Sequence, residues 1–451
     1  MPPRDRSLFD RARERVSTPG TSAVVAGSLV SGVGAYVFQL VGTRTLSDEA
    51  YAPIAVLWTM QYLAVTIALV SVEAYVTRAV TLHPDEPGRV DAAVRGLSVW
   101  VVGVAAALGA ASWLWRDELF HGHGGELPLV AALTVFGYGL FAVTRGRLAG
   151  GYRFREYGLA TAGESLARLA VAVPVALVAA STRSLAWTLP LGPFLVAAWW
   201  SVARRRPYRG PQRPEDADAG GAAVTGSTSR YLVATTVANA VSQSLLAAGP
   251  LVLIPLGATA AETSVFFVTV TAARVPMVFA FGGLLSRVLP PLTRVARAGD
   301  YRRLRRLAAA TCGTAAVLAV FGALAGAAVG PQIIALFFGA AFRPAAWFVA
   351  LTVAGVVTAT AALGLNQVLI GMGAETRLLA PWLVALLAGV ATVLLVQAEP
   401  TFRVAAGFVA GEVVALAGLL AAVLTARPAP AARPPAGAPA EPVPAPLRIV
   451  D

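Results

Sequence analysis

Lysine is absent from this sequence of 451 residues, and charged residues of every kind are scarce. All 36 basic residues are arginine, 24 residues are acidic, and charged residues make up 13% of the chain against 57% hydrophobic residues. The mean hydropathy of +0.68 lies far outside the range of ordinary soluble domains. The composition therefore indicates an integral membrane protein. The missing lysine, beside abundant Ala, Gly, Val and Pro, favours a GC-rich bacterial coding sequence and hence a bacterial cell membrane.

Cysteine and histidine are almost as scarce as lysine. Cys312 is the single cysteine, so an intramolecular disulfide is excluded, and its place in an apolar run is typical of a small core residue. Neither a CxxC nor an HExxH motif occurs, and His121 and His123 stand in a Gly-rich loop without a third ligand. We expect neither a metal site nor a cofactor.

Long apolar runs make up most of the chain. A run of about 20 apolar residues is long enough to cross the core of a bilayer as a helix. We therefore predict an all-α membrane protein with twelve transmembrane helices, at 21–44, 51–76, 96–115, 128–146, 157–180, 184–203, 231–256, 263–286, 307–328, 346–370, 378–397 and 404–425.

The arginines lie between the apolar runs and indicate topology. A net charge of +12 could suggest a nucleic-acid partner, but the basic residues do not gather on one face of a soluble domain. They concentrate in alternate connections, such as 203–216 and 294–307, which the positive-inside rule assigns to the cytoplasm. Both termini are then cytoplasmic: a basic segment at 1–20 and a Pro/Ala-rich tail at 427–451, which we expect to be disordered.

A polar insert at 204–229 divides the predicted helices into two sets of six, and the two halves are weakly similar. A shift of 213 residues places Glu49 of "DEAYAPIAVL" on Glu262 of "AETSVFFVTV". Because six is even, both halves enter the membrane from the same side, which predicts parallel lobes around a central cavity. The lobes would be 21–203 and 230–426. Chance similarity between apolar helices is the alternative, and the matching loop positions count against it.

Arg274 stands in the middle of the apolar stretch "VFFVTVTAARVPMVFAFGGLL", two residues before Pro276. An arginine at the centre of a membrane helix costs on the order of 3 kcal/mol. No acid lies within one helical turn, so its partner must come from another helix or from a ligand. Pro276 frees backbone groups, which is tolerated where they face protein or a water-filled cavity. We interpret Arg274 as a cation lining the cavity, the alternative being a buried structural residue.

Three further charged residues are predicted near the middle of the membrane. Glu164 and Arg168 are spaced i, i+4 with the acid first, the favourable order for a helix ion pair. They form a self-neutralising structural pair or take part in substrate binding or cation coupling. Glu412 follows a glycine in a run of small residues, which permits close helix packing. It is either a protonated acid packed between helices or a proton-carrying site.

A further set of charged residues is predicted near the cytoplasmic ends of the helices. Anchoring at the membrane surface accounts for most of them. They would also surround the inner mouth of the cavity with positive charge, and because a guanidinium group binds phosphate in a bidentate manner, we expect a phosphorylated anion as ligand. The residues are Glu73, Arg78, Arg145, Arg147, Arg287 and Arg294.

Three segments carry a resemblance to a known family: "RTLSDEAYAPIAVLW" (44–58), "TRGRLAGGYRFREYGLATAGESLARL" (144–169) and "RVPMVFAFGGLLSRVLPPLTRVARAGDYRRLRRL" (274–307). The chain is similar to the polysaccharide flippases of the multidrug/oligosaccharidyl-lipid/polysaccharide (MOP) exporter superfamily. This superfamily also holds the multidrug and toxin extrusion (MATE) transporters and the lipid II flippases. The resemblance covers the twelve predicted helices and excludes both tails.

The resemblance implies a transporter rather than an enzyme. Such proteins move undecaprenyl-pyrophosphate-linked oligosaccharides from the inner to the outer leaflet by alternating access, for cell-surface polysaccharide synthesis. The expected partners are this lipid-linked glycan, membrane lipids and a polysaccharide polymerase or ligase, and we expect a monomer.

The same resemblance assigns roles to the arginines and leaves one alternative. Arg274 would contact the pyrophosphate, Arg78 and Arg294 would capture the substrate at the inner mouth, and the remaining candidates are Arg145, Arg147 and Arg168. The alternative function is a cation-coupled, MATE-like exporter of small amphipathic molecules. In that case the coupling acid would be Glu164, Glu412 or Glu73. The first predicted helix has no acid, although MATE exporters commonly have one there, which counts against the exporter.

Overall fold

The computed structural model describes residues 21–83, 86–203, 226–277, 291–296 and 298–426. Within these ranges every regular element is a helix, and no strand occurs. The prediction of an all-α protein is confirmed. The predicted terminal segments and most of the predicted linker lie outside the described residues.

The first half of the chain folds into a group of helices that we call the N-terminal helix group. One long helix is composed of α3, a π-helical segment η1 and α4, which follow one another without a break. The elements are α2 (Thr21–Thr45), α3 (Asp48–Leu63), η1 (Ala64–Leu69), α4 (Val70–Leu82), α5 (Pro87–Leu114), α6 (Arg116–Leu119), α7 (Leu127–Gly150), α8 (Phe154–Ala179), α9 (Thr182–Ala186) and α10 (Leu191–Ala203).

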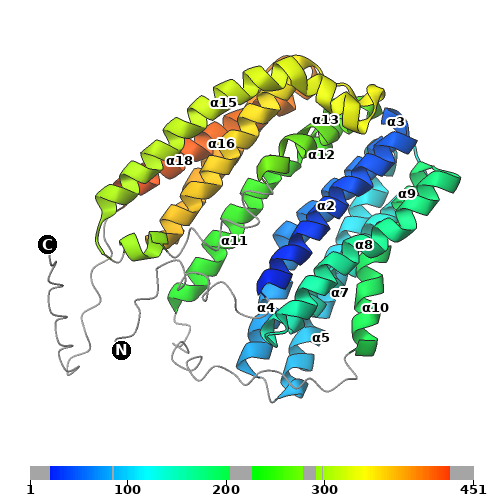
Figure 1. Cartoon of the computed structure of the whole chain (residues 1–451), viewed down its shortest axis with the longest axis horizontal. Coiled ribbons are helices and arrows are strands. Elements are labelled where there is room, and N and C mark those ends of the chain that lie inside the picture. Colours follow the sequence, from blue (N-terminus) through cyan, green and yellow to red (C-terminus); the bar gives the residue numbers. More distant parts are fainter. Residues whose placement is uncertain (1–20, 84–85, 204–225, 278–290, 297, 427–451) are drawn as a thin grey trace, which may run out of the picture.

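The second half forms the C-terminal helix group. Its elements are α11 (Gly226–Ala247), α12 (Gly249–Leu253), η3 (Ile254–Leu256), α13 (Ala260–Ala273), α15 (Tyr301–Phe338), η4 (Ala340–Phe342), α16 (Ala346–Gly371), η5 (Glu375–Leu378), α17 (Leu379–Leu395) and α18 (Pro400–Thr425). In Figure 1 these helices lie on one side and those of the N-terminal helix group on the other.

Nine helices of the described residues are long and apolar enough to cross a membrane. A tenth span is formed if the pair Thr235–Ala247 and Gly249–Leu256, which is bent by 64°, counts as one. The chain is thus a multi-pass membrane protein. The other two predicted spans fall on α10 and α13, next to residues outside the described ranges. A total of twelve stays a prediction, as does the cytoplasmic position of both termini.

The helices α3 and α13 begin in the same way. Ser47 caps α3 by accepting a hydrogen bond of 3.2 Å from the Ala50 amide, and Thr259 caps α13 by accepting one of 3.2 Å from the Glu262 amide. Each helix also has an acid in its first turn, at Glu49 and Glu262, where a negative charge stabilises the helix dipole. These are the two acids that the 213-residue shift superimposes.

The two helix groups meet where α3 and α13 begin. The helix α13 contacts α3, and α15 contacts α2 (Figure 1). The fully buried ring of Tyr51 lies between Phe267 and Phe342, at centroid distances of 6.3 and 5.8 Å. One continuous hydrophobic cluster therefore joins residues from both groups, and aromatic packing of this kind holds this end of the molecule together.

Two glycines place α8 close to α2. A Cβ atom at Gly27 or at Gly158 would collide with the backbone of the opposite helix. Small residues allow helices to approach closely within a membrane, where van der Waals packing is the main attraction between them. This contact fixes the position of α8, which carries Glu164 and Arg168.

Candidate functional site

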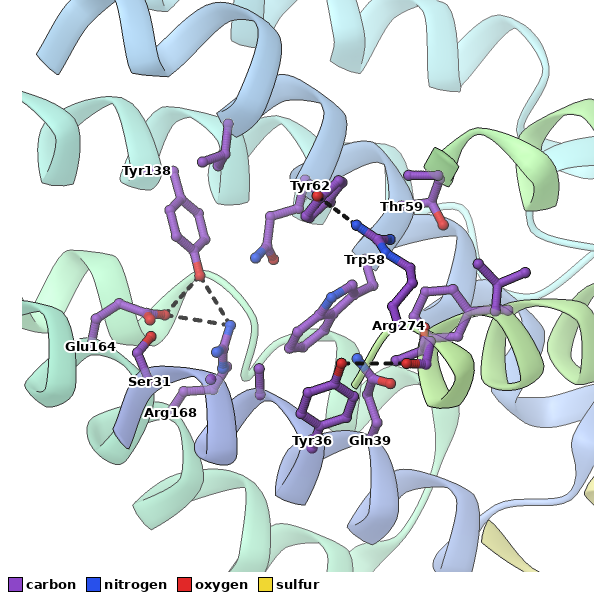
Figure 2. Close-up of a pocket in the computed structure, with 18 of the residues that line it drawn as sticks. Ser31, Tyr36, Gln39, Trp58, Thr59, Tyr62, Tyr138, Glu164, Arg168 and Arg274 are labelled. Carbon is purple, nitrogen blue, oxygen red and sulfur yellow. Dashed lines mark hydrogen bonds and ion pairs between the residues drawn. The ribbon is translucent and has the colours of Figure 1, made fainter. Parts of the chain in front are cut away.

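A cavity of about 270 Å³ lies between the two helix groups. The N-terminal helix group lines it with residues of α2, α3, η1, α7 and α8, and the C-terminal helix group with residues of α11, α12 and α13 and their junctions. Four of the charged residues singled out in the sequence border this central cavity: Arg145, Glu164, Arg168 and Arg274. In Figure 2, Glu164 and Arg168 lie on one side and Arg274 on the other.

Arg274 is positioned by the end of α13, where it is the C-cap residue. Its Nη2 atom donates a hydrogen bond of 2.6 Å to the hydroxyl group of Tyr62, and the guanidinium carbon lies 4.7 Å from the centre of the same ring (Figure 2). The Tyr62 hydroxyl in turn donates to Oε1 of Gln243 at 2.7 Å. Within the described part of the chain no carboxylate forms an ion pair with Arg274. Its positive charge therefore faces the cavity beside neutral partners.

Arg168 belongs to a buried triad with Glu164 and Tyr138. The Arg168 Nη1 atom lies 3.4 Å from Oε1 of Glu164 and donates to the Tyr138 hydroxyl at 3.0 Å, while that hydroxyl donates to Glu164 at 2.7 Å (Figure 2). Arg168 exposes only 2% of its surface, and the rings of Trp58 and Phe38 cover its guanidinium at 4.8 and 5.5 Å. Of the two interpretations of Glu164 and Arg168 made from the sequence, this geometry favours a self-neutralising structural pair.

Arg145 belongs to a second triad of the same composition. Its Nη2 atom lies 3.2 Å from Oε1 of Glu73 and donates to the Tyr157 hydroxyl, which donates to Glu73 at 2.8 Å. The helices α7 and α8 contribute to both triads, because Tyr138 and Arg145 share α7 while Tyr157 and Glu164 share α8. Each pair is separated by seven residues, which is about two helical turns. Each triad contains one arginine and one acid, so its formal charges cancel.

The other predicted arginines lie away from the central cavity. Arg78 is exposed and borders a separate cavity of about 520 Å³, which Glu73 and Arg145 also line. Arg147 forms an ion pair of 2.7 Å with Asp91 of α5, a partner that could not be predicted from the sequence. Arg294 is exposed, and Arg287 lies outside the described residues.

Glu412 occupies a different place from the other acids. Its side chain is fully buried in α18, and both carboxylate oxygens lack a hydrogen-bond partner within the described ranges. Glu412 does not border the central cavity. Because burying an unpaired ionised carboxylate costs far more than burying the neutral acid, the surroundings fit a packed, protonated acid.

Several residues that line the cavity have no sequence feature that identifies them as lining residues. Tyr36 donates a hydrogen bond of 3.3 Å to the Thr271 carbonyl across the two helix groups. Gln39 and Gln61 border the cavity, are buried, and have no partner for Oε1 among the described residues. A lone tyrosine or glutamine within an apolar run does not reveal which way it faces, so neither could be selected from the sequence.

Comparisons with known proteins show similarity at the level of the fold. No family model and no curated protein sequence matches the chain. An inward-facing conformation of a multidrug resistance MATE family transporter of the MOP superfamily matches 89% of this chain and 97% of its own, with 16% identity and a TM-score of 0.57. The chain has a MATE-like fold. The resemblance read from the sequence thus agrees with the structure at the level of the fold.

Further MATE structures match over similar lengths. An outward-facing conformation of a multidrug resistance MATE family transporter covers 89% of this chain and 94% of its own, with 16% identity and a TM-score of 0.44. A MATE transporter in complex with MaD3S covers 89% and 95%, with 17% identity and a TM-score of 0.48. The polysaccharide flippase branch, to which the sequence is similar, stays a prediction.

Proposed function

We propose that this protein is a flippase that moves an undecaprenyl-pyrophosphate-linked oligosaccharide from the inner to the outer leaflet of a bacterial cell membrane by alternating access. The observation that carries the proposal is the charge of Arg274 at the central cavity, which no carboxylate of the described residues neutralises. Arg168 and Arg145 are each paired with an acid, so Arg274 is the source of the positive charge of the cavity lining. An anionic group entering this cavity would be attracted to it.

The guanidinium group of Arg274 is suited to a pyrophosphate. Its Nη2 atom contacts a neutral hydroxyl, and its buried Nε atom has no hydrogen-bond partner among the described residues. A phosphate oxygen can accept from such free N–H groups, and the planar fork matches phosphate geometry. Arg78 and Arg294, both exposed, are the proposed capture residues nearer the cytoplasmic side.

The volume of the cavity limits what it can hold in this conformation. Small-molecule sites span about 300 to 1,000 Å³, and the central cavity, at about 270 Å³, lies just below that range. It fits a pyrophosphate and an adjoining sugar better than a whole oligosaccharide. Gln39 and Gln61 offer unpartnered amide oxygens, which can accept from sugar hydroxyls. A longer glycan would need the helix groups to separate further.

The contacts between the helix groups support alternating access. The Ser264 hydroxyl donates a hydrogen bond of 2.5 Å to the Asp48 carbonyl, beside the cluster around Tyr51. The arginine distribution assigns this end of the helices to the outside. In this conformation the cavity is then closed toward the outside, and the groups must part here to release the flipped lipid.

The proposal is tested with purified protein in liposomes that contain undecaprenyl-pyrophosphate-linked glycan. Arg274→Ala should abolish translocation, and Arg274→Lys should retain part of it because the charge is kept without the fork. Arg183→Ala is the matched control, since Arg183 is 74% exposed and pairs with Glu126, and neither residue lines the central cavity. Full translocation by Arg274→Ala would refute the role of this residue.

The same liposomes distinguish the alternative function. The buried, unpartnered carboxyl of Glu412 is the observation on which a cation-coupled exporter would rest. If the wild-type protein moves no lipid-linked glycan but exports an organic cation, and Glu412→Gln stops this export, the flippase proposal fails. If Glu412→Gln flips the lipid normally, Glu412 has a packing role only.

A further inference from the structure

A further cavity, larger than the central cavity, lies inside the C-terminal helix group, and its lining is almost wholly apolar. Its volume is about 470 Å³, and it lies between the bent pair α11 and α12 and the helices α13, α17 and α18. Ser244 is the only one of its lining residues with a polar side chain. Phe266, Val270 and Phe408 in its wall are buried. We call it the apolar cavity.

The apolar cavity adjoins the central cavity along α13 and along the bend between α11 and α12, because residues of these helices line both. Val270 lines both cavities, and it precedes Arg274 by four residues, or about one helical turn. Two adjacent residues of α13 face different cavities, because Phe267 lines the central cavity and Phe266 lines the apolar cavity. A phosphate group at Arg274 and a hydrocarbon chain beside Val270 would thus lie about one helical turn apart along α13.

The rim of the apolar cavity belongs to the surface that faces the membrane. Val390 and Leu394 of α17 line the cavity and expose 47% and 67% of their surface. The helix α17 crosses the membrane as part of the span Glu375–Leu395, so these side chains meet hydrocarbon rather than water. A lipid chain can therefore enter the cavity without crossing a polar surface.

We propose that the apolar cavity holds a stretch of the hydrocarbon chain of the transported lipid while the phosphate of that lipid contacts Arg274. This inference rests on the proposed function and adds to it a site for the chain, which would otherwise stay in the bulk bilayer. An apolar cavity of roughly 150 Å³ is large enough to bind benzene. The apolar cavity has about three times that volume, so it accepts a chain segment of several isoprene units.

The first test measures binding of undecaprenyl phosphate to the full-length protein in phosphatidylcholine nanodiscs. Val393→Phe places a larger side chain in the wall of the apolar cavity, and its matched control is Val384→Phe, which lies on the exposed face of α17 outside the cavity lining. Val393→Phe should weaken binding of undecaprenyl phosphate at least tenfold. It should leave binding of a glycosyl pyrophosphate without a lipid chain unchanged, and Val384→Phe should change neither.

The outcomes separate this inference from the proposed function. If Arg274→Ala abolishes binding of undecaprenyl phosphate and Val393→Phe has no effect, the flippase proposal stands and the chain site is refuted. If neither variant changes binding, both are refuted.

A second measurement uses the wild-type protein, so its result does not depend on whether a variant folds. Undecaprenyl phosphate with a diazirine group in its chain is bound and irradiated, and the labelled residues are mapped. Labels should lie within 386–394 and 404–408, and excess undecaprenyl phosphate should displace them. Equal labelling by a diazirine-bearing phosphatidylcholine would show that ordinary membrane lipid fills the cavity, which would overturn the inference.

Discussion

Arg274 of α13 and Tyr62 of α3 join the two helix groups across the central cavity through a hydrogen bond of 2.6 Å. Tyr62 also donates to Gln243 of α11 at 2.7 Å, so one hydroxyl group links three helices. A phosphate group that binds Arg274 would compete with this hydroxyl for the same guanidinium. Under the proposed function, substrate binding and the separation of the helix groups would be coupled at a single residue, as alternating access requires.

Tyr62→Phe tests this coupling. The change removes the hydroxyl group and keeps the ring that lies against Arg274. A hydrogen bond to a charged group contributes about 1.5 to 3 kcal/mol, so we expect the equilibrium between conformations to shift by at least about tenfold toward separated helix groups. Electron spin distances between labels at Tyr75 of α4 and Leu307 of α15, both exposed, would measure the shift in a Cys312→Ser background. An unchanged distance distribution would show that the bond does not hold the groups together.

The buried triad predicts a different effect for Arg168. Arg168→Met leaves Glu164 buried without its cation, and breaking a buried ion pair on one side costs about 3 to 5 kcal/mol. We expect a large fall in thermal stability in detergent. Arg168→Met combined with Glu164→Gln should recover most of this loss, because no unpaired charge remains.

Arg274→Ala is the comparison for the Arg168 variants. Arg274 has no acid partner within the described residues, so its removal should abolish transport and cost no more stability than its hydrogen bond to Tyr62 contributes, about 1.5 to 3 kcal/mol, which is less than the cost expected for Arg168→Met. If Arg274→Ala and Arg168→Met lose the same amount of stability, the distinction between a binding arginine and a structural one is wrong.

The charged residues could be located from the sequence, but a partner could be predicted only where it lies on the same helix. The spacing of Glu164 and Arg168 along one helix predicted their ion pair, which is observed at 3.4 Å, and the absence of a nearby acid predicted that Arg274 would line a cavity. Tyr62 lies 212 positions from Arg274, and Glu73 and Arg145 pair across two helices. Such contacts depend on how helices are rotated and packed. Uniformly apolar helices leave few polar positions from which a rotation could be predicted.

For the membrane helices, likewise, the positions could be predicted from the sequence but a bend could not. Apolar length predicted the positions of nine observed spans, because a membrane helix needs only a sufficient number of apolar residues. The 64° bend between α11 and α12 was not predicted from Pro250 and Gly249, since proline is also tolerated in straight membrane helices. That bend forms part of the wall of the apolar cavity.

Arg44 provides a test of the closed end of the cavity. This residue of α2 donates from Nε to the Phe337 carbonyl at 2.7 Å and from Nη2 to the Leu336 carbonyl, at the C-terminal end of α15. A cation there stabilises the helix dipole and satisfies free carbonyl groups. Through these hydrogen bonds Arg44 links the two helix groups beside the cluster around Tyr51. We therefore expect Arg44→Ala to favour opening at this end.

The measurement uses a cysteine in place of Ser264, which is fully buried at the contact with Asp48, again in a Cys312→Ser background. A thiol reagent that cannot cross the membrane is added from the outside, with Arg183→Ala as the control because Arg183 bonds within the N-terminal helix group. Arg44→Ala should raise the labelling rate several-fold and Arg183→Ala should not. Equal rates in all three proteins would mean that Arg44 does not close the cavity, and labelling only from the cytoplasmic side would reverse the predicted orientation.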